Sequence, residues 1–213
     1  MISDNSAQED VTTDEPQHWV LDTRPLLNFT ATGSIRLLQT LLGTPIGVPA
    51  EVHREWKQTV AAAEGRLRST PVSRHDPADV RMLTAFQNTT HCFDGNPFCV
   101  VHLYDTERNL AIELERDQQA IHPGEAAALA MCIHRGAEWA VVLDDRPAHA
   151  FALQQGIHTV GTLDLLVRGV RAGHLELDAS EALFSEIQRG WRRAPRGRLA
   201  EYVAGDQLIW NGE

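Results

Sequence analysis

Short apolar segments alternate along this chain with longer segments in which apolar residues recur at helical spacing. Residues 139–144 (WAVVLD) are apolar up to their last position, which favours a parallel strand buried on both faces. Residues 32–43 (TGSIRLLQTLLG) carry leucines and isoleucine three and four apart and end on glycine, which predicts a helix. Repeated strand–helix units predict a parallel sheet with right-handed crossovers. The expected strands are residues 18–22, 44–49, 139–144 and 157–161, and the expected helices are residues 32–43, 50–68, 123–134, 146–156, 162–173 and 178–193.

The pattern loosens in the middle of the chain. Turn signals (HDPAD and FDGNP) surround one plausible strand at residues 98–104, and residues 108–117 (RNLAIELERD) fit either a strand or a helix. A length of 213 residues suits one α/β domain rather than two. We therefore expect a flexible acidic tail at residues 1–17, a domain at 18–175 with an irregular insertion at about 69–121, and a helical extension at 176–213.

Charge and composition narrow the class of protein. Lysine plus arginine total 19 against 29 aspartates plus glutamates, a net charge of -10, which opposes nonspecific attraction to nucleic acid unless arginine patches or metal ions offset it. The sequence contains neither a run of apolar residues long enough for a membrane span nor a signal-peptide pattern at its acidic start. Three cysteines are too few for a disulfide framework. We expect a soluble cytoplasmic protein.

Acidic residues stand where strands end and helices begin. Because the carboxyl ends of parallel strands and the following helix starts share one edge of the sheet, these acids are expected to meet there. Crowded carboxylates raise each other's pKa, and Mg²⁺ or Mn²⁺ offsets that repulsion with oxygen ligands. The acids are Asp22 and Asp144-Asp145 after strands, Glu125 at a helix start, and Glu51 and Glu55, four apart on one helix face.

Four segments in this order resemble the PIN-domain family of metal-dependent ribonucleases, which includes the VapC-like toxins. They read VLDTRPLLNF, IGVPAEVHREW, GEAAALAM and VVLDDRPAHAFALQQGIHTVGTLDLLVRGVRAG, and the likeness runs from about Trp19 to Gly173. The resemblance implies a three-layer α/β/α sandwich with a central, mainly parallel sheet. It also implies one or two Mg²⁺ or Mn²⁺ ions that activate water to cut RNA.

The resemblance assigns roles to individual residues. It implies catalytic Asp22, Glu55, Glu125 and Asp145, metal ligands Asp22, Glu125, Asp144 and Asp145, and substrate contacts from Arg24 and Arg146. Two positions depart from the family pattern. Arg24 stands where many relatives carry a small hydroxyl residue, and it could pair with an acid, contact phosphate or impair metal binding. Asp164 occupies a common glycine position and adds an acid near a late helix.

Each acid also has a purely structural interpretation. Asp22, Asp144 or Asp145 could cap the helix that follows, since aspartate is a preferred N-cap. Glu51 is expected to be a solvated helix residue, and Arg24 an ion-pair partner. These interpretations remain open beside the metal site.

Two further groups have chemical potential. His91, Cys92, Cys99 and His102 are zinc-capable ligand types, but their spacing does not match zinc signatures, and buried cysteines with turn histidines are the commoner explanation. The basic run at residues 189–198 (RGWRRAPRGR) could hold RNA, with Trp191 as a stacking face, or could be a solvated helix end.

The sequence thus leads to a metal-dependent endoribonuclease, the toxin of a toxin–antitoxin pair. Its partners would be an RNA substrate and a cognate antitoxin, with a homodimer left open and no membrane. The alternative is a catalytically inactive PIN-like protein that binds RNA or protein, which Arg24 favours. A receiver-type signalling domain is disfavoured, because the first strand ends in the lone Asp22 and the chain's only lysine is Lys57.

Overall fold

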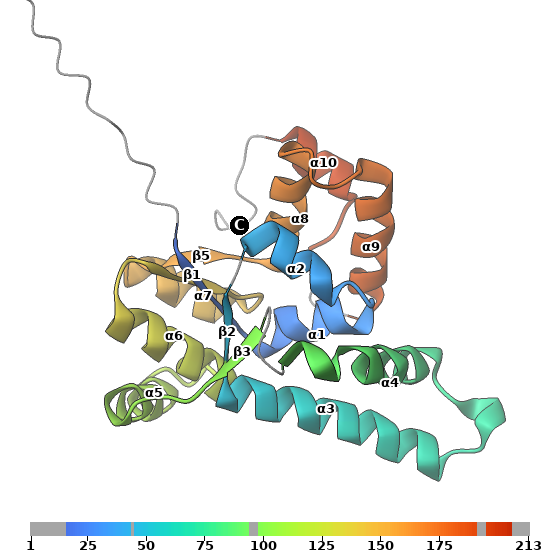
Figure 1. The fold of residues 1–213 in the computed structure, drawn as a ribbon, viewed down its shortest axis with the longest axis horizontal. Coiled ribbons are helices and arrows are strands. Elements are labelled where there is room, and N and C mark those ends of the chain that lie inside the picture. Colours follow the sequence, from blue (N-terminus) through green and yellow to red (C-terminus); the bar gives the residue numbers. More distant parts are fainter. Residues whose placement is uncertain (1–15, 44, 94–97, 191–194, 206–213) are drawn as a thin grey trace, which may run out of the picture.

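A single parallel sheet organises the protein in the computed structural model, which describes residues 16–43, 45–93, 98–190 and 195–205 (Figure 1). The described strands lie in the order β3-β2-β1-β4-β5, and every neighbouring pair is parallel. Their bounds are β1 (His18–Leu21), β2 (Ile46–Pro49), β3 (Phe98–Val101), β4 (Trp139–Val142) and β5 (His158–Val160).

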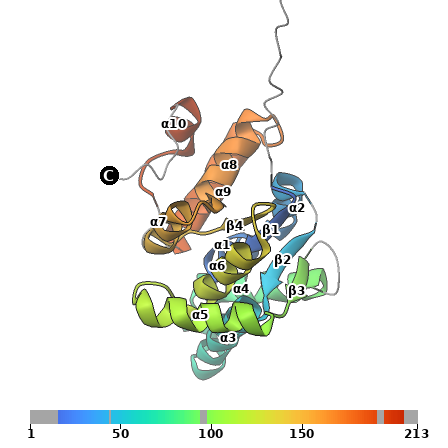
Figure 2. The same ribbon diagram turned by 90° about the vertical axis from the view of Figure 1, so that its left-hand side faces the viewer.

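Helices cover both faces of this sheet. One face packs against α1, α2, α3, α8 and α9, and the other packs against α5, α6 and α7 (Figures 1 and 2). The three-layer α/β/α prediction is therefore confirmed. The described helices are α1 (Thr23–Ala31), α2 (Ile35–Leu42), α3 (Ala50–Ser69), α4 (Pro77–Thr89), α5 (Asp105–Asp117), α6 (Pro123–Arg135), α7 (Arg146–Gln154), α8 (Thr162–Arg171), α9 (Leu177–Gly190) and α10 (Leu199–Ala204). None of them combines the length and the apolar character needed to cross a bilayer.

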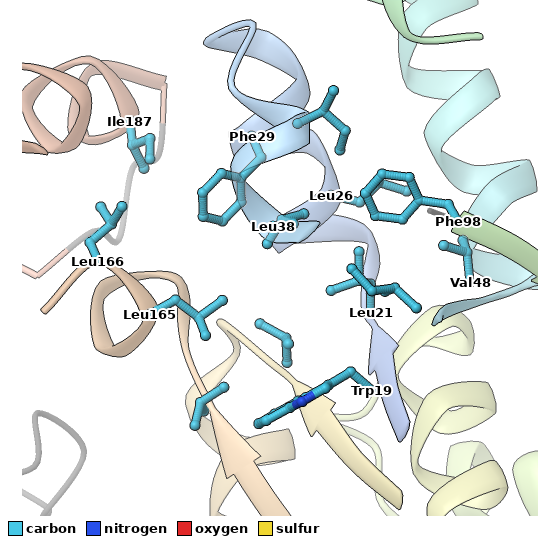
Figure 3. Close-up of a cluster of buried hydrophobic side chains, with 14 of the residues drawn as sticks. Trp19, Leu21, Leu26, Phe29, Leu38, Val48, Phe98, Leu165, Leu166 and Ile187 are labelled. Atoms are coloured by element: carbon cyan, nitrogen blue, oxygen red, sulfur yellow. The ribbon is translucent and has the colours of Figure 1, made fainter. Parts of the chain in front are cut away.

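The two cores follow from the alternation of side chains along β1. Trp19 and Leu21 point into the larger core with Leu26 and Phe29 of α1, whereas Val20 points into the core beneath α6 (Figure 3). Each fully buried side chain of this size contributes about 1.5–3 kcal/mol to folding. The short strands are thus held mainly by packing on both of their faces.

The order of the strands places a crevice between β1 and β4. From β1 the chain first builds β2 and β3 on one side and then returns to build β4 and β5 on the other. The connections therefore leave β1 and β4 in opposite directions, and ligands bind outside the carboxyl ends of strands at such a switch point. Asp22 follows β1, and Asp144 and Asp145 follow β4 closely at this edge.

Secondary structure departs from the sequence-based expectation in two places. Helix α1 was not predicted; its Pro25 lies in the first helical turn, where proline costs no hydrogen bond. Residues 69–121, expected to be an irregular insertion, contain α4, β3 and α5. Residues 108–117, whose pattern fitted either a strand or a helix, belong to helix α5, and Ile112 of that pattern is exposed.

The structure describes the two predicted terminal segments to different extents. Residues 1–15 of the expected tail lie outside the described residues. The described part of the expected C-terminal extension forms α9 and α10, whose Phe184, Ile187 and Leu199 are buried in the same core as the sheet. The domain boundaries themselves remain predictions.

A buried ion pair joins α5 to α6 beside the sheet. Glu107 is fully buried and accepts hydrogen bonds from Arg135 (Nε–Oε1 2.7 Å) and from the Tyr104 amide (2.8 Å). Burial alone raises the pKa of Glu107, but these hydrogen bonds outweigh it and hold the pKa below its usual range. The Arg135 guanidinium also lies over the ring of Trp139 at 4.7 Å. The pair therefore fixes the helix layer on this face.

We expect Arg135→Ala to lower the free energy of unfolding by about 3–5 kcal/mol, because it leaves the Glu107 carboxylate buried without a counter-charge. Arg108→Ala is the control, since Arg108 pairs with Asp105 on the exposed surface of α5, and such pairs contribute little. Urea unfolding at pH 7, followed by circular dichroism, measures both variants. Equal losses would contradict the account.

Candidate active site

Asp22 lies at the centre of the carboxyl edge of the sheet. Its amide donates a hydrogen bond to the Val142 carbonyl (3.1 Å), which extends the pairing of β1 with β4 by one residue. Its carboxylate is the N-cap of α1 and accepts from the Arg24 amide at 3.3 Å. The capping interpretation is therefore correct for Asp22, and the same side chain is buried at the switch point.

Asp144 is held rigidly by two residues that the sequence interpretation missed. Its Oδ1 accepts from the Thr162 amide (2.7 Å), and its Oδ2 accepts from the Thr162 hydroxyl (2.6 Å) and the Asn28 side-chain amide (2.8 Å). Thr162 begins α8 just after β5, and Asn28 lies on α1. The threonine of the GTLDLL segment is the only sequence signal that could have indicated this contact.

Glu125 and Asp145 enter the same edge from two helix starts. Glu125, in the first turn of α6, accepts from the His122 amide through Oε2 (2.9 Å), and its Oε1 accepts no hydrogen bond from the described residues. Asp145 is the N-cap of α7 and accepts from the Ala148 amide (3.3 Å). Capping thus orients both carboxylates and uses only part of their capacity to accept bonds.

Glu55 links its own helix α3 to the starts of α1 and α6 through two hydrogen bonds. Its Oε2 accepts from the Thr23 hydroxyl (2.6 Å), and its Oε1 accepts from the Gly124 amide (3.0 Å). A Cβ at position 124 would lie 2.7 Å from Glu55 Oε2 and 2.8 Å from Thr23 Oγ1, so only glycine allows this approach. Thr23 and Gly124 were missed because neither residue type carries a distinctive chemical pattern.

The carboxylates at this edge repel one another in a buried setting. Burial raises the pKa of Asp22 to about 7, with further increases from Asp144 and Glu55. Burial likewise raises the pKa of Glu125 to about 8, with further increases from Asp22 and Asp145. Burial raises the pKa of Asp144 to about 6 despite its hydrogen bonds from Thr162. Asp144 and Glu55 are thus near enough to Asp22, and Asp22 and Asp145 are near enough to Glu125, for their negative charges to interact.

The raised pKa values make the metal-free fold less stable as pH rises. Between the ordinary values near 4 and the folded values of about 6 to 8, the folded state binds more protons than the unfolded state. The free energy of unfolding therefore decreases as pH increases through that interval. A bound cation would remove this cost.

The two arginines assigned to substrate lie at the rim of the site. Arg24 is exposed, and its charge lowers the pKa of Asp144 and of Glu125. Among the described residues it forms no ion pair within 4.0 Å. The positive charge of Arg24 thus lowers the pKa values of these acids from a distance, without the direct ion pair that was one of the expectations. Arg146 is exposed beside Asp145 in the first turn of α7.

Two other acids differ in their surroundings. Glu51 was expected to be solvated, but it is only partly exposed, and its Oε2 is sealed from water without a hydrogen bond from the described residues. That expectation was wrong, because this helix face turns toward neighbouring elements. Asp164 accepts from the Gly161 amide (2.8 Å) in the capping box of α8. Its hydrogen bond is therefore a structural one.

The zinc-capable residues and the basic run are only partly within the described structure. Cys92 is buried, Cys99 is half-buried and His102 is exposed, while the side chain of His91 and residues 191–194, with Trp191, lie outside the described residues. Of the run's arginines, Arg198 lies 3.8 Å from Glu181.

The donor chemistry of the acidic edge fits a hard divalent cation. All its donors are carboxylates, and their pKa values are raised by burial and mutual repulsion, which a cation relieves. Within the described part of the chain, no group of three or more His, Cys, Asp or Glu side chains is placed so that it could hold one metal ion. Mg²⁺ commonly takes one or two carboxylates and completes its sphere with water and phosphate oxygens, so a sparse protein sphere suits it.

Comparison with known proteins connects this arrangement to a family. A family model described as a PIN domain matches residues 100–201, which include Glu125, Asp144 and Asp145 but not Asp22 or Glu55. No curated protein and no solved structure matches the chain. The unmatched part supplies β1 and β2, which complete the same parallel sheet and add Asp22 to its carboxyl edge. The match over residues 100–201 therefore supports assigning this part of the chain to the PIN-domain family.

Proposed function

We propose that this protein is an endoribonuclease that depends on Mg²⁺ or Mn²⁺ and hydrolyses phosphodiester bonds of RNA. The PIN domain is a nuclease-type fold that implies nucleic-acid binding. The observation that carries the proposal is that burial raises the pKa values of Asp22, Glu125 and Asp144 at the β1–β4 switch point, and that neighbouring carboxylates raise those of Asp22 and Glu125 further. Buried acids that repel one another cost stability, so their presence together favours a role in binding a cation.

In this proposal Asp22, Glu125, Asp144 and Asp145 would hold the metal. When bound, the metal would lower the pKa of water and stabilise negative charge on the scissile phosphate. The chain's own residues orient these ligands: Thr162 and Asn28 fix both oxygens of Asp144, and the His122 amide fixes Glu125. Such support orients each carboxylate individually, and the carboxylates would have to move closer together for three of them to hold one ion, since no such group exists among the described residues.

Glu55 acts in this proposal as a positioning residue. Both of its oxygens are engaged, one by Thr23 next to Asp22 and the other by Gly124 next to Glu125. It therefore sets the distance between the end of β1 and the start of α6, and with it the distance between two of the ligands.

The toxin role and its partners are a further part of the proposal. Support comes from the family alone, which is an argument by analogy. The expected partners are an RNA substrate and an antitoxin that masks the acidic edge, and the expected location is the cytoplasm.

One observation favours a second candidate function, an inactive PIN-like binding module. The positive charge of Arg24 already lowers the pKa of Asp144 and of Glu125, and so substitutes in part for a cation. The variant Arg24→Ala distinguishes the two candidates. Stronger Mn²⁺ binding by the variant would show that Arg24 competes with metal, as the inactive binding module requires. Weaker RNA binding by the variant would show that Arg24 holds phosphate, as the nuclease proposal expects.

Cleavage of a fluorescent single-stranded RNA measures the proposed activity. Wild type is expected to cut in Mg²⁺ or Mn²⁺ and to stop in EDTA. Asp22→Asn and Asp145→Asn should each slow cleavage by roughly 100-fold or more, because each removes a charged ligand while asparagine keeps the helix cap. Asp178→Asn, an exposed acid of α9, is the control and should cut at the wild-type rate. Inert wild type in both metals, with intact folding, would contradict the proposal.

Gly124→Ala tests the positioning role of Glu55. The added methyl would collide with Glu55 Oε2 and Thr23 Oγ1, so we expect cleavage to fall by about 10- to 100-fold. Gly65→Ala is the matched helical control, since nothing lies within 4 Å of its added Cβ; its rate should not change, and its stability should rise by up to about 1 kcal/mol. An unchanged cleavage rate in Gly124→Ala would show that Glu55 does not set the site.

A further inference from the structure

An open groove runs along the outer flank of α3, beside the edge strand β3. Its volume is about 660 Å³, and it is lined by Ala50, His53, Arg54, Lys57, Gln58, Ala61, Val100 and His102. Figure 1 shows α3 extending from the sheet next to β3, so the groove starts at the sheet and continues along the helix. Between Ala50 and Ala61 the helix rises by roughly 16 Å.

The lining of the groove is cationic, although the chain as a whole is acidic. It contains two permanent cations, Arg54 and Lys57, and two imidazoles, but no carboxylate among the described residues. Neither cation forms an ion pair with the described part of the chain. Lys57 is the only lysine in a chain with 29 acids and 19 bases. The two charges are thus close together, and no carboxylate of the described residues lies within ion-pair distance of either.

The groove lies next to the acidic edge on the same helix. Arg54 and Glu55 are consecutive in α3, so their side chains leave the helix about 100° apart. Glu55 points to Thr23 and Gly124 at the acidic edge, whereas Arg54 lines the groove. A chain bound at the acids can therefore continue over α3 into the groove.

The floor of the groove is suited to an extended polymer rather than to an enclosed small molecule. Ala50, Ala61 and Val100 provide a small apolar surface, and the ring of His53 is held by stacking on Trp56 (5.8 Å between centroids) and contact with Phe93 (4.8 Å). Single-stranded nucleic acid binds to such surfaces through cations that follow the backbone and flat groups that contact bases.

We propose that the groove of Arg54, Lys57 and His102 binds the sugar–phosphate backbone of single-stranded RNA on one side of the acidic edge. The inference rests on the proposed function in taking RNA as the ligand. The groove supplies attraction for phosphates, and the acidic edge, which repels them in the absence of a cation, supplies the chemistry. Binding and cleavage would thereby use two neighbouring faces of α3 that are about 100° apart.

Fluorescence anisotropy of a labelled 15-nucleotide unstructured RNA, in EDTA and over a range of KCl concentrations, tests the groove. Arg54→Gln/Lys57→Gln is expected to weaken binding about tenfold and to reduce the slope of log K against log salt by roughly 1.4, since two phosphate contacts are lost at about 0.7 each. Arg54→Lys/Lys57→Arg keeps both charges and should bind within about twofold of wild type.

The control is Arg68→Gln/Arg74→Gln, which removes two charges from the exposed far end of the same helix hairpin and should bind as wild type does. Equal losses of RNA affinity in both double variants, or no RNA binding by the wild type, would contradict the proposed role of the groove. A polyglutamate peptide that binds the groove more tightly than RNA would assign it to an acidic protein segment and would also overturn it.

The assay contains no divalent ion, so its result is independent of cleavage. RNA binding that depends on the groove, without any cleavage in Mg²⁺ or Mn²⁺, would support the RNA-binding role of the groove and contradict the proposed nuclease activity. Cleavage together with groove-independent binding would reject the groove and retain the nuclease.

Discussion

Repulsion between buried carboxylates at the end of β1 and β4 is the constraint on which this site depends. Asp22 and Asp144 are placed there by the strand pairing itself, since the Asp22 amide bonds to Val142, and Glu125 arrives from α6. Burial raises the pKa of all three groups, and neighbouring carboxylates raise those of Asp22 and Glu125 further. The fold tolerates this cost because two tightly packed cores on either face of the sheet hold the strands in place. The acidic site is therefore destabilising in itself, and the packing of the two surrounding cores offsets its cost.

The strands and the acids that follow them could be predicted from sequence because both depend on local patterns. Continuous apolar character indicated β4, and the parallel arrangement then placed Asp22 and Asp144 at one edge. The partners of Asp144 could not be predicted in this way. Asn28 lies on α1, which the sequence pattern did not predict, and Thr162 reaches Asp144 from a different strand–helix unit. Contacts between segments distant in sequence leave no periodic signal.

Positive and negative side chains leave helix α3 on different faces, a separation that the net charge of the chain does not reveal. A total of -10 argues against nucleic-acid binding, yet Arg54 and Lys57 gather on one face of α3 and Glu55 lies on a neighbouring one. The basic run at residues 189–198 attracted attention in the sequence because its arginines are adjacent. The groove did not, because its cations are three residues apart and become neighbours only on the helix surface.

Calorimetric titration of the metal-free protein with Mn²⁺ at pH 7, in two buffers of different ionisation enthalpy, tests the central claim most directly. With pKa values of about 7 for Asp22 and about 8 for Glu125, Asp22 is about half protonated and Glu125 is mostly protonated at pH 7, and a cation must displace these protons. The account predicts proton release on Mn²⁺ binding in wild type, and strongly weakened binding with less release in Asp22→Asn. Binding without proton release, or equal binding by both proteins, would show that these acids do not form one cation site.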